Sequence, residues 1–248
     1  MGAVQLKRVT IRNGRERPAA PRPWKIVVVG SSGHARVILD ILRQAGQYEV
    51  IGLLDTYKPQ GSGCSSHVVL GTCEDLPALI AAEQVEGGIV AIGDNWTRAK
   101  IAGQIKAIVP GFRFVTAVHP SARVAEDVTL GDGTVVMAGA ILNPGCVIGE
   151  SSIINTGASL DHESVMGDFS SLGPGVVTGG RVRIGNYTAI GIGAVVLQEI
   201  TIGEHTVIGA GATVVGNVPG YVVAYGTPAR VMRAREAGDP YLGERKGK

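Results

Sequence analysis

A column of apolar residues recurs at every sixth position through the second half of the chain. The residue after each column position is often glycine, and the residue two before it is small or β-branched. Thr178 is the single polar member of the column. Its members are Val118, Val124, Leu130, Val136, Leu142, Ile148, Ile154, Leu160, Met166, Leu172, Thr178, Ile184, Ile190, Val196, Ile202, Ile208 and Val214.

An α-helix cannot hold a period of six, because 3.6 residues per turn would spread the column around the cylinder. Short parallel strands that close into a prism can hold it, with one side chain of each strand inward and a glycine or small residue at each turn. Each coil of such a prism buries its face only against the next coil. The repeat therefore predicts a parallel β-helix, although its handedness does not follow from the period.

Residues 24–117 follow a different pattern, in which apolar runs alternate with helical periodicity. We expect strands over residues 25–30, 48–55, 88–93 and 113–118, and helices over 34–47, 73–83 and 96–108. Alternation of strands and helices predicts a small Rossmann-like α/β domain with a parallel sheet. The change to the repeats is expected near His119–Pro120.

The first turn from strand to helix has the sequence GSSGHA over residues 30–35. In a doubly wound fold this turn binds phosphate, because backbone N–H groups at the helix start face the anion and glycine permits close approach. Ser32 stands where the dinucleotide motif has its middle glycine, so the turn favours a nucleoside diphosphate over NAD. Asp55 ends the second strand, where such folds often hold a ribose or base. A tight turn without a ligand remains the alternative.

Composition removes several classes of function. The net charge is +2, but residues 1–25 hold seven cations and one anion, so the remaining chain carries −4 and offers no basic face for nucleic acid. We expect residues 1–23 to form a basic, disordered extension.

No stretch approaches the roughly 18–20 apolar residues of a membrane span. The three cysteines (Cys64, Cys73 and Cys146) lack C-x-x-C spacing, which argues against disulfides and zinc and favours the cytoplasm.

The polar cluster Asp161-His162-Glu163 interrupts the repeats and is the strongest candidate for chemistry. An imidazole beside a carboxylate suits a general base, because the carboxylate fixes the tautomer and stabilises the cation. The alternative is a solvated histidine in a turn.

Three-histidine zinc sites also occur on such prisms, but the chain has no H-x-x-x-x-H pair, so we expect no metal. Cys146 belongs to the column of small residues and is expected to serve packing.

These motifs resemble the NeuD/PglD family of bacterial sugar acetyltransferases, over about residues 25–232. The resemblance rests on the GSSGHA turn, the segment from Asn155 to Glu163, the hexapeptide array and the ending GTPAR over residues 226–230. It implies a left-handed β-helix with three hexapeptides per coil, which gives between five and six coils over residues 118–217. It also implies a homotrimer with active sites between neighbouring prisms, and acetyl-CoA as co-substrate.

The resemblance further implies roles for single residues. His162 is the expected base and Glu163 its support. Ser32, Gly33, His34 and Asp55 are expected to bind the nucleotide sugar, with Asn155 and Thr156 at the substrate. Acetyl-CoA is expected along the prism near Gly180, Ile192, Ala210 and Pro228. Some members of the family carry a histidine where Ser171 stands here, so their contacts to the acetyl group do not transfer directly.

We therefore expect an N-acetyltransferase that acts on a nucleotide-linked 4-amino-6-deoxy sugar, with UDP as the expected nucleotide, by direct transfer. O-acetylation of free sialic acid and a non-catalytic trimeric scaffold remain the alternatives. The expected organisation is an extension over residues 1–23, a nucleotide-sugar-binding domain over 24–117, the acetyltransferase β-helix over 118–232 and a solvated tail over 233–248.

Overall fold

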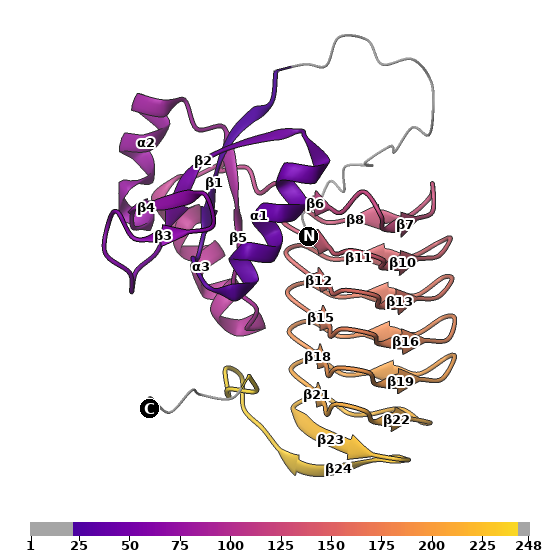
Figure 1. Cartoon of the computed structure of the whole chain (residues 1–248). Coiled ribbons are helices and arrows are strands. Elements are labelled where there is room, and N and C mark those ends of the chain that lie inside the picture. Colours follow the sequence, from indigo (N-terminus) through magenta and orange to yellow (C-terminus); the bar gives the residue numbers. More distant parts are fainter. Residues whose placement is uncertain (1–21, 243–248) are drawn as a thin grey trace.

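The computed structural model describes residues 22–242, so the expected extension lies almost entirely outside the described residues. Two parts lie side by side in Figure 1, an α/β part at the N-terminal end and a tall prism of short strands. The expected fold class is confirmed, because a parallel α/β sheet is followed by a left-handed parallel β-helix.

The α/β part is built on a five-stranded sheet with the order β3-β4-β2-β1-β5. Strand β1 pairs in parallel with β2 on one side and β5 on the other. Its apolar side chains Ile26 to Val29 are buried, as the apolar run predicted. The elements are β1 (Trp24–Val29), α1 (Gly33–Ala45), β2 (Tyr48–Leu54), β3 (Gly63–Cys64), β4 (His67–Gly71), the 3-10 turn Cys73–Asp75, α2 (Leu76–Glu83), β5 (Gly87–Val90) and α3 (Asn95–Ile108).

The prism has three faces, and each of its regular strands is two residues long. Each two-residue strand pairs in parallel with a strand of a neighbouring coil, as in Ile153↔Ser171 and Ile154↔Leu172. The docked face, which packs against the α/β part, contains β6 (Ala117–Val118), β9 (Val135–Val136), β12 (Ile153–Ile154), β15 (Ser171–Leu172), β18 (Ala189–Ile190), β21 (Val207–Ile208), β23 (Val222–Gly226) and β24 (Ala229–Ala234).

The second face, called here the apolar face, contains β7 (Arg123–Val124), β10 (Ile141–Leu142), β13 (Ser159–Leu160), β16 (Val177–Thr178), β19 (Val195–Val196) and β22 (Thr213–Val214). The third face contains β8 (Thr129–Leu130), β11 (Val147–Ile148), β14 (Val165–Met166), β17 (Arg183–Ile184) and β20 (Thr201–Ile202). The first corner follows the docked face along the chain, the second follows the apolar face, and the third follows the third face.

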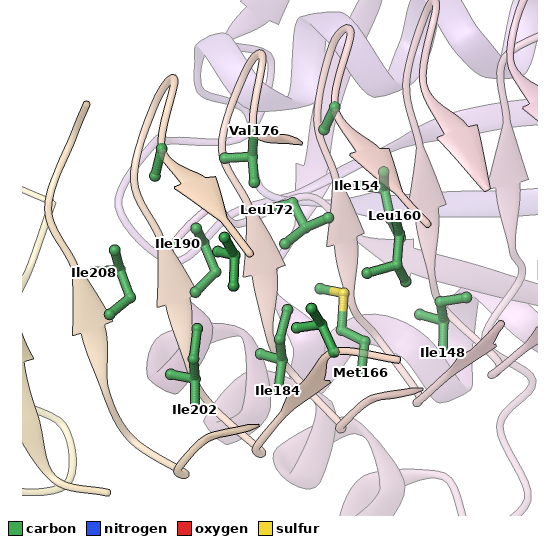
Figure 2. Packing of buried hydrophobic residues seen from close by; sticks show 14 of the residues in the cluster. Ile148, Ile154, Leu160, Met166, Leu172, Val176, Ile184, Ile190, Ile202 and Ile208 are labelled. Atoms are coloured by element: carbon green, nitrogen blue, oxygen red, sulfur yellow. The ribbon is translucent and has the colours of Figure 1, made fainter. Parts of the chain in front are cut away.

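The second residue of each strand pair points into the prism, and these residues form its core (Figure 2). Ile154, Leu160 and Ile208 are fully buried there. Thr178, the one polar member of the column, is also buried, and its hydroxyl accepts a hydrogen bond of 3.1 Å from the N–H of Asp161. The break in the apolar column therefore lies directly beneath the Asp161-His162-Glu163 turn.

A buried arginine joins the two parts. Arg98 of α3 is 1% exposed, and its guanidinium donates to the carbonyls of Ser151 (2.7 Å) and Ser170 (3.4 Å) at the third corner. It also donates to the Ile92 and Gly93 carbonyls and to the side chain of Asn95. Burial lowers the pKa of Arg98 to about 10. Every N–H of this cation has an oxygen acceptor, which makes its burial tolerable.

An aromatic column along the third corner adds to this junction. Phe169, Tyr187, His205 and Tyr221 stack at centroid distances of 5.7, 4.5 and 4.8 Å, one residue per coil. Trp96 of α3 meets Tyr187 edge-on at 5.5 Å. His205 is 6% exposed within this column.

The structure differs from the sequence-based expectation in three places. The strand expected over residues 113–118 is split, because Phe114 forms only an isolated bridge to Gly88 while β6 already pairs with β9 of the prism. The hairpin of β3 and β4 was not expected. The tail was expected to be solvated, whereas Arg235 is buried and donates to the His205 carbonyl at 2.9 Å.

Two further findings concern the described range, residues 22–242. None of its helices is long and apolar enough to cross a bilayer. It holds no group of three or more His, Cys, Asp or Glu side chains arranged to bind a metal ion.

Candidate active site

His162 lies at the second corner, in the turn that joins β13 to β14. The turn is fixed by Asp161, whose Oδ1 accepts the N–H of His162 at 2.8 Å and the side-chain amide of Asn143 at 2.7 Å. The hydrogen bond from the backbone of His162 is the largest cause that lowers the pKa of Asp161. These bonds hold the backbone and leave the imidazole projecting from the corner.

The imidazole of His162 is paired with Glu163. The distance from Nδ1 to Oε2 of Glu163 is 3.3 Å, and the two side chains are 47% and 64% exposed. A carboxylate can only accept, so this contact favours the tautomer with the proton on Nδ1. Nε2 is then left with a free lone pair, as a general base requires.

Gly180 lies directly under the His162 ring, one coil further along the prism. A Cβ at this position would collide with Nε2 and Cε1 of the imidazole. The family resemblance implies that Gly180 contacts acetyl-CoA. In the structure, the missing side chain of Gly180 also leaves the space that the His162 ring occupies.

Arg181 extends the His162–Glu163 pair to the next coils. Its guanidinium lies 3.7 Å from Oε2 of Glu163 and is also bonded to Glu199. The backbone N–H of Arg181 donates to the His162 carbonyl at 2.8 Å. Arg181 was not expected from the sequence, although the hexapeptide register places it one coil after Glu163.

Asn155 and Thr156 occupy the first corner, not the second. Asn155 Oδ1 accepts the N–H of Thr156 at 2.8 Å. Exposed Ile192 and Ala210 lie on the same corner, two and three coils after Thr156, and Pro228 is exposed in the connection between β23 and β24. Within one chain, the expected substrate residues Asn155 and Thr156 therefore share a corner with Ile192 and Ala210. His162 and Gly180 lie at a different corner.

The turn between β1 and α1 and the residues after β2 meet at the carboxyl edge of the sheet. Ser31 donates to Asp55 Oδ2 at 2.5 Å, and Asp55 Oδ1 accepts the N–H groups of Tyr57 (2.8 Å) and Lys58 (3.1 Å). Burial acts to raise the pKa of Asp55, but these hydrogen bonds outweigh it and lower the pKa. The carboxylate thus clamps two loops together.

Lys58 and Tyr57 are presented by this clamp, and neither was expected from the sequence. The Lys58 ammonium donates to the Ser31 carbonyl at 2.7 Å, and the Tyr57 side chain is 95% exposed. Ser32 and Gly33 are exposed beside them at the start of α1. Their N–H groups, with a nearby ammonium, form an edge suited to an anion.

His34 lies in the first turn of α1, and its Nε2 is buried without a hydrogen-bond partner among the described residues. Burial and, secondarily, the charge of Arg98 lower its pKa to about 4. A bound ligand could supply the hydrogen bond that Nε2 of this neutral imidazole lacks. The structure thus brings Ser32, Gly33, His34 and Asp55 to one sheet edge, as the motif predicted.

Two protein families match parts of the chain. Residues 25–105 match the family described as PglD N-terminal domain, and residues 181–216 match the family described as bacterial transferase hexapeptide (six repeats). Among curated proteins, UDP-N-acetylbacillosamine N-acetyltransferase of Bacillus subtilis is 31% identical over 114 residues. That match covers 46% of this chain and 51% of the relative, so it spans about half of the curated relative's length.

Solved structures extend the likeness over most of the chain. A histidine-to-alanine variant of GDP-perosamine N-acetyltransferase from Caulobacter crescentus, in complex with CoA and GDP-perosamine, is 37% identical with a TM-score of 0.80. The match covers 84% of this chain and 97% of that one. The acetyltransferase domain of PglB from Neisseria gonorrhoeae, in complex with acetyl coenzyme A, is 33% identical with a TM-score of 0.78, and the match covers 85% of this chain and 100% of that one.

Proposed function

Since this chain belongs to the PglD-type family of hexapeptide-repeat sugar N-acetyltransferases, we propose that it transfers acetyl from acetyl-CoA to the amine of a nucleotide-linked 4-amino-6-deoxy sugar. Two relatives support this substrate class, because one is named for a UDP-linked sugar and the other was solved with GDP-perosamine and CoA. UDP and GDP are accordingly the two nucleotides to compare first.

The observation that carries the proposal is the His162–Glu163 pair above Gly180. It offers one imidazole nitrogen to a substrate while the other is held by a carboxylate at 3.3 Å. A positioned base of this kind typically contributes 10²–10⁴-fold to a rate. The histidine-to-alanine variant solved for the Caulobacter relative supports a histidine as the residue of interest in this family.

In the proposed reaction, the sugar amine attacks the thioester carbonyl of acetyl-CoA and a C–N bond forms. Nε2 of His162 takes the proton that the amine loses, and Glu163 stabilises the resulting imidazolium. The C–S bond then breaks, and the imidazolium returns the proton to the departing thiolate, which leaves as free CoA. Prism N–H groups are suited to stabilise the tetrahedral oxyanion. No acyl-enzyme is needed, because both substrates are held in line.

The acetyl-CoA site is proposed along the exposed first-corner residues Ile192 and Ala210, with Pro228 towards the adenine end and Gly180 contributing from the second corner of another copy. One chain separates these two corners by the width of the apolar face. That face exposes Ile141, Val177 and Val195, which are 42%, 48% and 40% exposed. Three prisms with their apolar faces inward would bring the first corner of one copy against the second corner of the next, which supports the homotrimer.

The nucleotide is proposed at the carboxyl edge of the α/β sheet. The N–H groups of Ser32 and Gly33 and the Lys58 ammonium favour a diphosphate, and the buried Nε2 of His34 supports a contact to the ligand. Asn155 and Thr156 are proposed beside the sugar. We also propose that the reaction takes place in the cytoplasm.

A thiol-release assay with acetyl-CoA tests the proposal on UDP-, dTDP- and GDP-linked 4-amino-6-deoxy sugars, with free sialic acid alongside. We expect turnover of one nucleotide-linked amine, reduced by at least about 100-fold in His162→Ala. His119→Ala is the matched control, since His119 lies at the start of the prism, away from the His162 turn, and its ring bonds to Ser121.

Two outcomes contradict the proposal. Turnover of sialic acid alone would favour the O-acetyltransferase alternative and would leave the GSSGHA turn without its proposed ligand. Full activity of His162→Ala on a nucleotide sugar would remove His162 as the base. The scaffold alternative is disfavoured by the family, which includes structures solved with CoA or acetyl-CoA bound.

A further inference from the structure

Three charged side chains stack along the second corner, one in each of three successive coils. Glu163, Arg181 and Glu199 occupy equivalent positions in these coils. Arg181 lies between the two carboxylates, with Nη1 3.7 Å from Oε2 of Glu163 and Nε 3.0 Å from Oε1 of Glu199. We call these three residues the charge ladder.

The upper end of the charge ladder is the carboxylate that contacts His162. The same oxygen, Oε2 of Glu163, faces both Nδ1 of His162 and the Arg181 guanidinium. Glu163 is 64% exposed, so its side chain can change rotamer unless a neighbour restrains it. A planar guanidinium fixed from below can hold such a carboxylate in place.

Arg181 is itself fixed at two points. Its backbone N–H donates to the carbonyl of His162, and its side chain is anchored on Glu199. Arg181 also adopts a left-handed backbone conformation with φ of +58°, as Glu163 and Glu199 do in their coils. The repetition of this turn geometry aligns the three side chains along one line.

We infer, on the basis of the proposed function, that Arg181 is a positioning residue which holds Glu163 against Nδ1 of His162 and moderates the negative charge that Glu163 presents there. A carboxylate without this cation would stabilise the imidazolium more strongly and would keep the base protonated to higher pH. If the Glu163 carboxylate moved away from Nδ1, the tautomer of His162 with its proton on Nδ1 and a free lone pair on Nε2 would no longer be favoured. The Arg181 cation balances these two requirements.

The charges that face His162 are those of Asp161 and Glu163 in its own turn, with Arg181 and Glu199 in the two coils below. Asp161 is held by Asn143 and by the backbone of His162, and Asp127 bonds to the backbone of Gly145 in the coils above. Arg181 is the cation nearest to the pair among the described residues, so its removal is the informative change.

The test compares Arg181→Gln with Arg183→Gln, in the full chain, by steady-state kinetics from pH 5.5 to 9. Arg183 is the exposed first residue of β17, two positions along the same coil, and is not part of the charge ladder. We expect Arg181→Gln to lower the plateau of kcat by about 10-fold with both KM values within about twofold, and to move the acid limb about half a pH unit upward. Arg183→Gln should resemble the wild type.

Three further variants distinguish the positioning of Glu163 by Arg181 from a general electrostatic effect of the Arg181 charge on His162. Arg181→Lys should restore the acid limb but only part of the plateau, because an ammonium lacks the planar fork. Glu199→Gln should move the acid limb downward, because Arg181 is released towards Glu163. In a Glu163→Gln background, Arg181→Gln should change kcat by less than about twofold, since the carboxylate that it positions is gone.

Two kinetic results would overturn the inference. Wild-type kinetics for Arg181→Gln, or the same loss with and without Glu163, would remove the positioning role. If the wild type acetylates no sugar in the panel, the proposed function fails, and the inference is then tested by NMR titration of the imidazole signal that His162→Ala removes. That titration midpoint should rise in Arg181→Gln and not in Arg183→Gln, and an unchanged midpoint would contradict the inference.

Discussion

Thr178 and Gly180 act on the His162 turn from the coil below it. Thr178 accepts the N–H of Asp161 with its buried hydroxyl, and Gly180 leaves the space in which the imidazole lies. Neither residue has a side chain suited to acid–base chemistry. Both instead determine where the backbone and the ring of His162 are placed, and the proposed proton transfer depends on that placement.

Gly180→Ala should displace the imidazole, because its Cβ would collide with Nε2. We expect kcat to fall by about 100-fold while the KM for the nucleotide sugar stays within about threefold. Gly216→Ala is the matched control, since Gly216 lies in the same corner column and an added Cβ would meet no atom within 4 Å. Equal activity of the two variants would show that the ring position does not matter.

His34 makes the stability of the fold depend on pH. Burial and the Arg98 charge lower its pKa to about 4, from the ordinary 6.5, so the unfolded chain binds the proton first as the pH falls. The stabilisation is therefore complete above pH 6.5 and is lost between about 6.5 and 4. Between pH 7.5 and 5, the free energy of unfolding should fall by about 2 kcal/mol from this residue.

Urea unfolding followed by circular dichroism at both pH values measures this loss. His34→Gln should show a smaller decrease, and His67→Gln, whose half-buried ring contacts Ser66, should behave as the wild type. An equal decrease in His34→Gln and the wild type would mean that another group, such as buried His205, causes the dependence.

At the scale of the elements, the aromatic column and α3 join the α/β part to the prism, and within residues 22–242 no strand of the α/β sheet pairs with a strand of the prism. Tyr187 has three ring neighbours, namely Trp96 of the α/β part and, along the column, Phe169 and His205. Arg98 and Asn95 add hydrogen bonds from α3 to the same corner. The column and these hydrogen bonds thus help to fix the position of the α/β part relative to the prism.

Tyr187→Ala should therefore weaken the junction, with a loss of about 2–3 kcal/mol in the free energy of unfolding. Chemical denaturation measures the loss, and limited proteolysis should show faster cleavage between the α/β part and the prism. Tyr225→Ala is the control, because Tyr225 lies half exposed on β23 and outside the column. Equal stability of both variants would show that the column contributes little to the junction.

At the scale of the whole molecule, the apolar face of the prism lies between the corner of Asn155 and Thr156 and the corner of His162. Strands β6, β9 and β12 of the docked face pack against α1 and its sheet, whereas the apolar face exposes β-branched residues along several coils. Association through this face would join the corner of His162 to the corner of Asn155 and Thr156 from a second copy. A monomer would contain every residue of the proposed site without assembling it.

Val195→Glu should prevent this association, because three buried carboxylates would meet near the axis. We expect a trimer for the wild type and a monomer for the variant in sedimentation experiments, with turnover reduced by more than about 100-fold. Thr201→Glu on the third face is the control and should stay trimeric. A monomeric wild type with full turnover would contradict the proposed arrangement of sites.

The sequence by itself determined the prism, since a period of six fixes which side chain of each short strand points inward and requires no long-range information. It also predicted the α/β sheet and named His162, Glu163 and His34, because turn motifs are local. Only the tertiary structure revealed the support beneath these residues. Thr178, Gly180, Arg181 and Arg98 act through neighbours far away in the chain, across coils or between domains. The sequence gives the order of residues along the chain, whereas the stacking of coils brings together residues that are 18 positions apart, such as Glu163 and Arg181. The contacts that support the proposed site therefore appear only in the folded prism.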